Sequence, residues 1–472
     1  MMTRTAAALL WIGAGCASPC PGADDVALHV GVAEVDITPP LGTRMGGYFR
    51  DRFADGLRDP LHAKAIVLAQ GGTKIVLVFG DLPGLPAHVS TRARERAEAR
   101  TGIPEAHISM AATHTHTGPY LPYGIHLAAD RDPDASAGTI SFLVDKLVEV
   151  IEKAHSALRP SRLEVGRPLQ TPPLSFQRRH HFNDGKVPTI GPVTRDLPDH
   201  EPQKIVRPAG PIDPEVNVLL VRGSEGQPCA SLAVFALHLN TVGDTRVGET
   251  QWSADFPHFL GRELRRTFGG GFISLFGAGT CGDINYVDVS KPKTRTTEEI
   301  GTMIARTVLS EIPNLRPLES VALGASRVRY PAPLQRFSPE RVAQARKDLE
   351  RPDALPFLKR VEATSILALE RMPEKTWPVE IQAFRLSSDV AVVALPGEIF
   401  VELGLAIKRD SPFRTTFVIE LANDSTPLYV PTRKAFEESG YEVLNSRLDA
   451  GSGERMVREA LALLRGLDGN RK

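Results

Sequence analysis

Two histidines separated by one residue are the feature of this chain with the clearest chemical potential. His114 and His116 lie in the segment 113–119, which reads THTHTGP and follows the apolar run 108–112. Neutral imidazole is a common ligand of catalytic zinc because it need not lose a proton before it binds. In an extended strand residues i and i+2 share a face, which would bring both rings to one side. The spacing indicates a metal site at a strand end; the competing interpretation is a pair of buried, hydrogen-bonded histidines.

Four more polar residues follow apolar runs. His238 follows the run 233–237, and Glu398 follows a Pro-Gly pair after the run 390–395. A glutamate there would complement two imidazoles as in His₂Glu zinc sites, or would simply occupy the first turn of a helix, whose dipole favours an anion. Asp283 and Asn285 follow the run 272–276 in a glycine-rich stretch, which indicates either a ligand-binding loop or a tight turn.

The elements that must position these residues read as a strand-rich α/β pattern with α+β character. Short runs of Val, Ile, Leu and Ala predict buried strands at 65–69, 75–79, 216–221, 232–236, 390–395 and 417–421. Amphipathic patterns predict helices at 88–100, 142–158, 255–268, 297–312, 339–349 and 454–464. The first two strands flank Gly71 and Gly72, which predicts an antiparallel hairpin and argues against an all-parallel sheet.

Composition and the N-terminus narrow the class of protein. The 472 residues carry 56 basic and 56 acidic side chains, so no overall field favours nucleic acid. Residues 1–23 read as a secretory signal peptide, with a lipid anchor at Cys16 as the alternative to simple cleavage. We expect no transmembrane segment after it and an exported protein, periplasmic or secreted. Cys229 and Cys281 would pair or act as small buried residues. The proline-rich stretch 186–214 predicts a lid, substrate loop or insertion.

The order of several short motifs says more than any one of them. They are VDITPP at 35–40, DPLHAKA at 59–65, THTHTGP at 113–119, Gly282-Asp283, PGE at 396–398 and LAND at 421–424, followed by Tyr429 and Tyr441. From about residue 30 to the C-terminus the chain resembles the catalytic domain of the neutral/alkaline non-lysosomal ceramidases. This resemblance implies one zinc hydrolase domain over 24–472, built on two central β-sheets flanked by helices. It implies cleavage of the N-acyl bond of a ceramide or a similar amphiphilic lipid.

The resemblance also implies a set of site residues. Zn²⁺ would be held by His114, His238, Glu398 and Tyr429, and would activate water for attack on a carbonyl. The remaining residues with implied roles are His116 as proton shuttle or oxyanion stabiliser, Tyr441 and Asp283 in the catalytic segment, and Arg178 as a substrate contact.

The chain departs from the family at two points, and these keep two alternatives open. Asn285 stands where the ceramidases carry a serine; its amide would donate to an oxyanion but cannot be a nucleophile. The family's C-terminal β-sandwich domain is expected to be absent. One alternative is therefore an exported zinc hydrolase of a soluble amide or ester, such as an acylated sugar. The other is a noncatalytic binding protein on the same scaffold.

Overall fold

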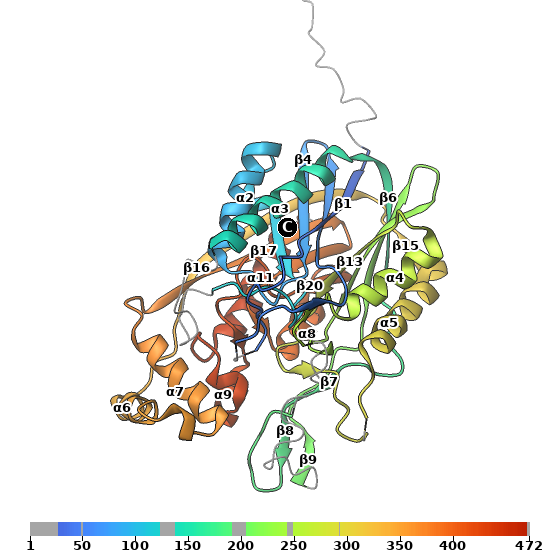
Figure 1. Ribbon diagram of the computed structural model, residues 1–472. Helices are drawn as coiled ribbons and strands as arrows, with labels where there is room; N and C mark the ends of the chain where they lie inside the picture. Colours follow the sequence, from blue (N-terminus) through green and yellow to red (C-terminus); the bar gives the residue numbers. More distant parts are fainter. Residues whose placement is uncertain are drawn as a thin grey trace, which may run out of the picture.

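Two β-sheets packed face to face form the centre of the molecule (Figure 1). The structure is a computed structural model that describes residues 27–48, 51–122, 137–190, 204–242, 249–291 and 293–469. Within these residues the larger sheet has the order β13-β11-β10-β6-β1-β3-β4-β5, with β15 also paired to β6, and the smaller has the order β16-β17-β18-β20. The strands of the larger sheet are β1 (His29–Asp36), β3 (His62–Gln70), β4 (Thr73–Gly80), β5 (Ile108–Ala112), β6 (Arg159–Gly166), β10 (Asn217–Gly223), β11 (Pro228–Phe235), β13 (Ile273–Ala278) and β15 (Arg316–Pro317). Those of the smaller sheet are β16 (Val321–Pro333), β17 (Thr376–Ser387), β18 (Val390–Ala394) and β20 (Thr415–Ile419).

Helices cover the outer face of each sheet, so the core is divided into layers. Alternate residues of a strand point to opposite faces. Leu68 of β3 therefore packs between the sheets with Val392 of β18, whereas Val67 packs outward with Leu147. The larger sheet is covered by α2 (Ala87–Thr101), α3 (Ala137–Ser156), α4 (Phe256–Phe268) and α5 (Thr297–Glu311). The smaller sheet is covered by α8 (Val401–Asp410), α9 (Arg433–Glu438), α10 (Tyr441–Leu444) and α11 (Ser452–Asp468). The predicted pair of central sheets flanked by helices is confirmed.

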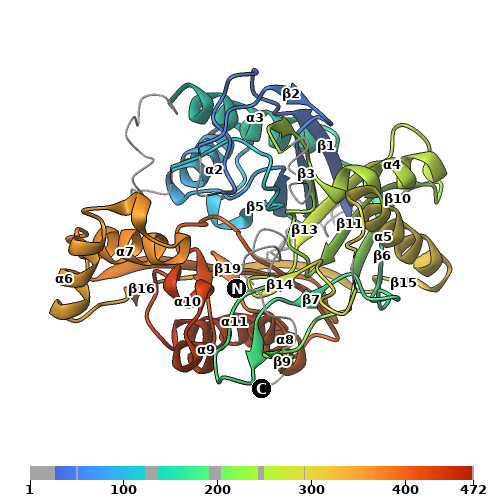
Figure 2. The ribbon, with the colours of Figure 1, turned by 60° about the horizontal axis from the view of Figure 1, so that its bottom comes forward.

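The same unit occurs three times: an antiparallel hairpin, a helix, and a strand parallel to the second strand of the hairpin. The units are β3-β4-α2-β5, β10-β11-α4-β13 and β17-β18-α8-β20. Parallel neighbours end at the same edge of a sheet, and ligands in α/β proteins gather outside those carboxyl ends. Figure 2 shows β5 and β13 coming together with the short strands β14 (Ile284–Asn285) and β19 (Glu398–Ile399) in the middle of the molecule.

The remaining short elements connect these units. They are β2 (Gly56–Leu57), β7 (Phe176–Gln177), β8 (His180–Phe182), β9 (Ile205–Pro208), β12 (Gln251–Trp252), β21 (Tyr429–Val430), α6 (Pro339–Asp348), α7 (Phe357–Glu370) and the 3-10 turns η1 (Glu105–His107), η5 (Ile312–Asn314) and η6 (Pro352–Ala354). Helices α6 and α7 form a hairpin inserted between β16 and β17, at the lower left of Figure 1. In the part of the chain that the structure describes, none of the helices combines the length and apolar character needed to cross a membrane.

Local sequence patterns predicted the buried elements well and the half-exposed ones poorly. The hairpin at 65–79 is confirmed as β3 and β4, with both Gly71 and Gly72 at positive φ. The long β16-β17 hairpin was missed because much of it is only half buried, so its strands are not continuous apolar runs. Glu398 lies in β19, and α8 begins later at Val401, so the interpretation as a residue of the first helical turn is wrong.

Other expectations fall partly or wholly outside the described residues. The stretch 186–214 is not simply a loop, because β9 pairs with β8; residues 191–203 lie outside the described part. The signal peptide at 1–23 and Cys16 also lie outside it. Cys229 and Cys281 are both free thiols, and Cys281 is buried.

Candidate metal centre

Three imidazoles converge at the carboxyl ends of the parallel strand pairs. The Nε2 atom of His238, which follows β11, lies 3.0 Å from Nε2 of His114 and 3.1 Å from Nε2 of His116. Oε2 of Glu398, which follows β18, lies 3.4 Å from Nε2 of His114. One ring nitrogen from each of the three histidines lies within 4.8 Å of the corresponding nitrogens of the other two. The structure thus brings together three histidines and a glutamate from segments that are far apart in the sequence.

The orientation of the His114 ring is fixed by its surroundings. Its Nδ1 lies 2.6 Å from the carbonyl oxygen of Pro83, which can only accept, so Nδ1 carries a proton and Nε2 is the atom that would bind a metal. Burial lowers the pKa of His114, but the carboxylate of Glu398 outweighs burial and raises that pKa overall. Burial lowers the pKa of His116 and His238 well below the usual value, and the charge of His114 lowers both further. Burial therefore favours the neutral form of both rings, which is the form of imidazole that binds a metal.

The separations between the polar atoms of this cluster are those expected around a bound cation. The Oε2 atom of Glu398 is buried and has no hydrogen-bond partner, although buried carboxylates normally have one. It lies 3.4 Å from Nε2 of His114, which in turn lies 3.0 Å from Nε2 of His238. Ligand atoms around a tetrahedral zinc lie roughly 3.3 Å apart, because each bond is roughly 2.0–2.1 Å. The observed separations of 3.0–3.4 Å fit such a site.

The threonines of the THTHT segment anchor it to the scaffold. The hydroxyls of Thr115 and Thr117 donate to the carbonyl of Ser253 at 2.7 and 2.8 Å. Ser253 in turn donates to Asp59 of the DPLHAKA motif at 2.6 Å. The backbone does not continue β5 as an extended strand, since His114 has φ 79. The two imidazoles reach one site through this turn rather than through simple strand alternation, which corrects the reason for their shared face.

Close backbone packing holds Glu398 in place. Gly397 has φ 82, and a Cβ there would lie 2.7 Å from the carbonyl oxygen of Leu428. A Cβ on Gly282 would lie 2.5 Å from the carbonyl oxygen of Glu398. Glu420 accepts from the backbone N–H of the residue after Glu398, at 2.7 Å. The Pro-Gly-Glu and Gly-Asp motifs therefore have a steric reason: only glycine lets these chains meet.

Two tyrosines and an arginine line the side of the cluster next to Glu398. Tyr429 is the β-bridge partner of Glu398, and its ring centroid lies 5.6 Å from that of Tyr441. The guanidinium of Arg178 lies 5.1 Å from the ring centroid of Tyr429 and donates to Glu442 at 2.8 Å. Burial raises the pKa of Tyr429 well above its usual value. Tyr429, Tyr441 and Arg178, which the sequence singled out for separate reasons, thus lie beside one another.

The structure uses Asp283 and Asn285 to hold the scaffold together. Asp283 accepts from the backbone of Val401 and from the side chain of Gln177, both at 2.8 Å, and burial raises its pKa to about 6. Asn285 donates to the carbonyl of Ile190 at 2.7 Å and accepts from the backbone of the residue two positions on, at 2.9 Å. Both side chains have partners in the protein, unlike the orphan oxygen of Glu398.

Sequence reasoning missed two buried acids behind the site. The carboxylate of Glu420 accepts hydrogen bonds from the backbone N–H of Cys281 at 3.1 Å and from the Cys281 thiol at 3.0 Å. Burial raises the pKa of Glu420 to about 8. Glu420 directly follows β20, but the predicted run 417–421 included it, so the strand-end criterion that selected His238 passed over it. Glu442, which pairs with Arg178, follows Tyr441 and gives no comparable signal.

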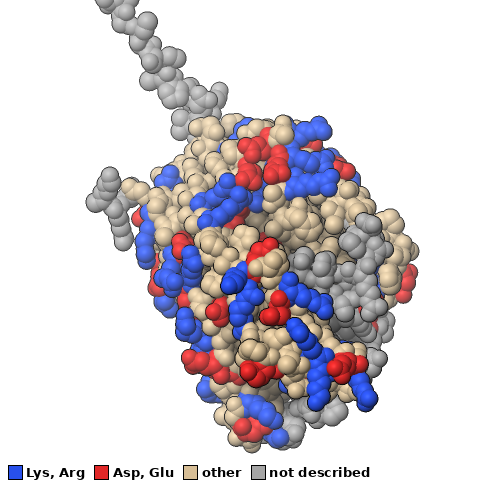
Figure 3. Space-filling model, turned by 90° about the vertical axis from the view of Figure 1, so that its left-hand side faces the viewer, with Lys and Arg blue, Asp and Glu red and all other residues tan. Residues whose placement is uncertain are grey.

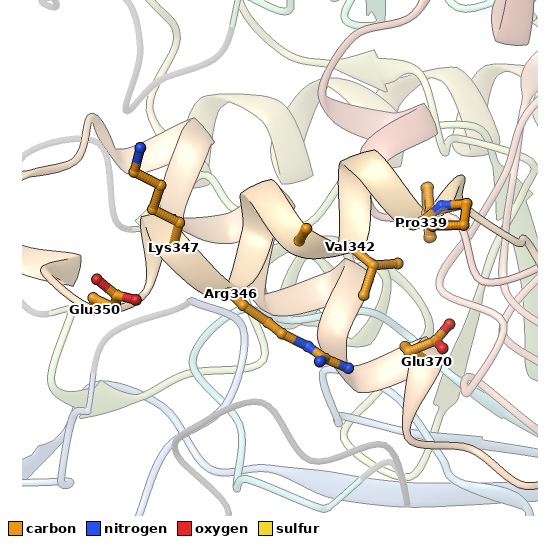
Figure 4. A pocket seen from close by; sticks show the side chains of 8 residues that line it. Pro339, Val342, Arg346, Lys347, Glu350 and Glu370 are labelled. Atoms are coloured by element: carbon orange, nitrogen blue, oxygen red, sulfur yellow. The ribbon is translucent and has the colours of Figure 1, made fainter.

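A surface groove lies apart from this centre. It has a volume of about 600 Å³ and is lined by α6, by Phe337 and by the end of α7 at Glu370. Figure 4 shows Arg346 reaching from α6 toward the end of α7 that carries Glu370. On the face shown in Figure 3, basic and acidic side chains are mixed, in keeping with the formal net charge of zero. None of the residues that line the groove belongs to the metal centre.

Comparison with known sequences connects the first third of the chain to a family. Residues 28–170 match the profile described as neutral/alkaline non-lysosomal ceramidase, N-terminal. A neutral ceramidase of Pseudomonas aeruginosa is 27% identical over 232 residues, which are 47% of this chain and 31% of that relative. A neutral ceramidase of Oryza sativa subsp. japonica is 30% identical over 145 residues, 29% of this chain and 18% of that relative. The matched stretches span less than a third of either relative.

Comparison with solved structures extends the likeness in fold. The crystal structure of neutral ceramidase from Pseudomonas aeruginosa has a TM-score of 0.70 at 20% identity, covering 94% of this chain and 75% of the other. A second structure, of a ceramidase complexed with C2, has a TM-score of 0.68 at 18% identity, covering 94% of this chain and 76% of the other. The two central sheets with their helices are thus a ceramidase-like architecture.

Proposed function

The chain belongs to the neutral/alkaline non-lysosomal ceramidase family, and from this premise we propose that it is a zinc-dependent amidohydrolase of ceramide-like lipids. The observation that carries the proposal is the convergence of three imidazoles beside a buried carboxylate oxygen that has no hydrogen-bond partner. Imidazole, carboxylate and phenol oxygens form a borderline donor set of the kind that zinc prefers. A noncatalytic protein would have no need to keep these costly contacts.

Two ligand sets fit the contacts, and we propose the one that includes Glu398. In it His114, His238, Glu398 and Tyr429 hold the metal, and His116 remains free for proton transfer. The alternative uses the imidazoles of His114, His116 and His238 alone. The first set is favoured because it alone uses the buried Oε2 of Glu398, which accepts no hydrogen bond, as a ligand, and because Tyr429 is the neighbour of Glu398 across β19 and β21.

The chain's own residues then divide the work of hydrolysis. A bound zinc would supply an electrophile for the carbonyl and lower the pKa of water. His116 would take a proton from the attacking water and return it to the nitrogen as the C–N bond breaks, releasing a fatty acid and an amine. Arg178 and Tyr441 lie beside Tyr429 and would contact the polar part of the substrate. Asp283 and Asn285 would hold the surrounding turn.

We also propose that the domain spans 24–472 and that the protein is exported. The support is the N-terminal sequence, a positive residue followed by a short apolar run and small residues. Secretion or periplasmic export would bring the enzyme to lipids outside the cytoplasm. Cell fractionation of the full chain would test whether it is exported, with a variant that carries Arg in the apolar run as the control that should stay in the cytoplasm.

The test of the proposed activity is fatty acid release from a short-acyl ceramide in detergent micelles, by the zinc-loaded chain without residues 1–23. We expect release that a chelator abolishes and added zinc restores, and no release by the His238→Ala variant. An acylated sugar and a simple ester, assayed in parallel, test the soluble-substrate alternative. Zinc-replete protein that cleaves either of these but not the ceramide would contradict the lipid assignment.

A further inference from the structure

Arg52 connects three segments around the metal centre. Its side chain is only 4% exposed, and it lies in the connection between β1 and β2. The guanidinium donates to the carbonyl of His116 at 2.7 Å, and also to the carbonyls of Gly46 and Glu249. These acceptors are 64, 6 and 197 residues away in the sequence, so one side chain joins three separate loops.

The loop that carries Arg52 also packs directly on His116. The ring of Tyr48 meets the His116 ring edge-on, with centroids 5.1 Å apart, and Arg52 lies over Tyr48 at 4.4 Å. Gly47 approaches so closely that a Cβ there would lie 2.6 Å from Cα of His116. The other side of His116 is tied to the His238 segment, because its N–H donates to Leu239 at 3.0 Å.

We propose that Arg52 is a positioning residue that sets the main chain of His116 and thereby aims its imidazole at the reacting atoms. The expected effect on catalysis rests on the proposed function. The expected effect on the position of His116 does not. Two hydrogen bonds hold the main chain of His116: its N–H donates to the carbonyl of Leu239, and its carbonyl accepts from Arg52. Loss of the second would let the ring turn away from His238 while the other histidines stay anchored.

The planar guanidinium suits this task better than any other side chain. Arginine presents five N–H donors in a fixed fork, whereas the lysine ammonium is a compact point charge. Lysine at position 52 would keep the positive charge but cannot reach acceptors on three loops at once. An effect of charge alone would survive Arg52→Lys, and an effect of geometry would not.

The experiment compares Arg52→Met and Arg52→Lys with Arg94→Met as a matched control. Arg94 is 2% exposed and pairs with Glu380 at 2.5 Å on α2 and β17, away from the histidines. In the metal-free full chain, we would measure the rate at which diethylpyrocarbonate modifies His116, by mass spectrometry, with His107 as internal reference. In the zinc-loaded chain we would measure kcat, KM, zinc content and thermal stability.

In Arg52→Met we expect diethylpyrocarbonate to modify His116 several-fold faster than in the wild type, with the rate at His107 unchanged. We expect kcat to fall by about 10²-fold, because misplacement by about 1 Å has that cost, with KM and zinc content held. Arg52→Lys should recover little of this, and Arg94→Met should lower stability without changing either reading. An unchanged His116 rate in both Arg52 variants, or an equal rise in Arg94→Met, would overturn the proposal. The modification rate needs neither substrate nor metal, so it stays decisive if the ceramidase assay fails.

Discussion

The segments that follow β5 and β13 have the same place in the fold but use their polar side chains differently. Each follows the last strand of a hairpin–helix–strand unit and reaches the centre of the molecule. After β5, His114 and His116 turn inward to the cluster. After β13, Asp283 and Asn285 are both bound to backbone or amide groups of the scaffold.

The difference shows that a position after a strand brings a residue to the centre of the molecule but does not decide whether it faces the cluster or bonds to the scaffold. Within the THTHT segment the division is visible residue by residue: threonines bind the scaffold, and histidines face the cluster. In the Gly282–Asn285 turn, the side chains of Asp283 and Asn285 both form hydrogen bonds with the scaffold. Substitutions in the two segments should therefore change different quantities.

The largest effect is expected from a ligand that the comparison places in the centre. His238→Ala should lower kcat/KM by more than about 10³-fold, because the metal and the activated water are lost together. Zinc content measured by mass spectrometry should fall with the activity, while the circular dichroism spectrum stays native. Full zinc occupancy in His238→Ala would show that the ligand assignment is wrong.

A smaller effect is expected where an imidazole serves the reaction but not the metal. His116→Gln should lower kcat by about 10²–10³-fold, the usual cost of losing one electrostatic group at the reacting centre. Zinc should remain bound at wild-type stoichiometry. Loss of zinc from this variant, with Glu398→Gln still loaded, would favour the three-imidazole set instead.

In the second segment, Asp283→Asn should change stability more than activity. The amide cannot accept from both Val401 and Gln177, so unfolding free energy should fall by about 1–3 kcal/mol at pH 5. The pKa of Asp283 in the folded protein, about 6, lies above the usual value of 3.8 for an exposed aspartate. The wild-type carboxyl therefore favours folding at low pH and loses that contribution as pH rises from about 4 to about 6. The gap between the two proteins in urea unfolding should therefore narrow at pH 7. A gap that widens with pH would contradict the assignment.

The smallest effect is expected from Asn285→Ser, which places the family's serine in this chain. Serine has a single oxygen in place of the separate Nδ2 and Oδ1 atoms that bond to Ile190 and to the backbone of Val287. One of the two bonds is therefore lost, and we expect a loss of about 1 kcal/mol in stability. The rate of fatty acid release should stay within about threefold of wild type. A tenfold gain in kcat would show that position 285 takes part in the chemistry.

Sequence alone predicted what depends on short-range pattern. The β3-β4 hairpin, the helices of the outer layers and the strand-end positions of His114 and His238 follow from apolar runs and turn residues. Glu398 was assigned a helical alternative because its pairing with Tyr429, 31 residues later, leaves no local trace. Arg52 gave no signal at all, since its acceptors lie on loops far away along the chain. Burial and long-range hydrogen bonds decide such roles, and neither is written in a local pattern.

The most direct test is a crystal structure of the full chain soaked in zinc, with diffraction recorded on both sides of the zinc absorption edge. We predict one anomalous peak at bonding distance from Nε2 of His114, Nε2 of His238, a carboxylate oxygen of Glu398 and the hydroxyl of Tyr429. His116 should lie beside it without ligating. A peak bound by the three imidazoles with Glu398 turned away, or no peak at this position, would contradict the proposed centre.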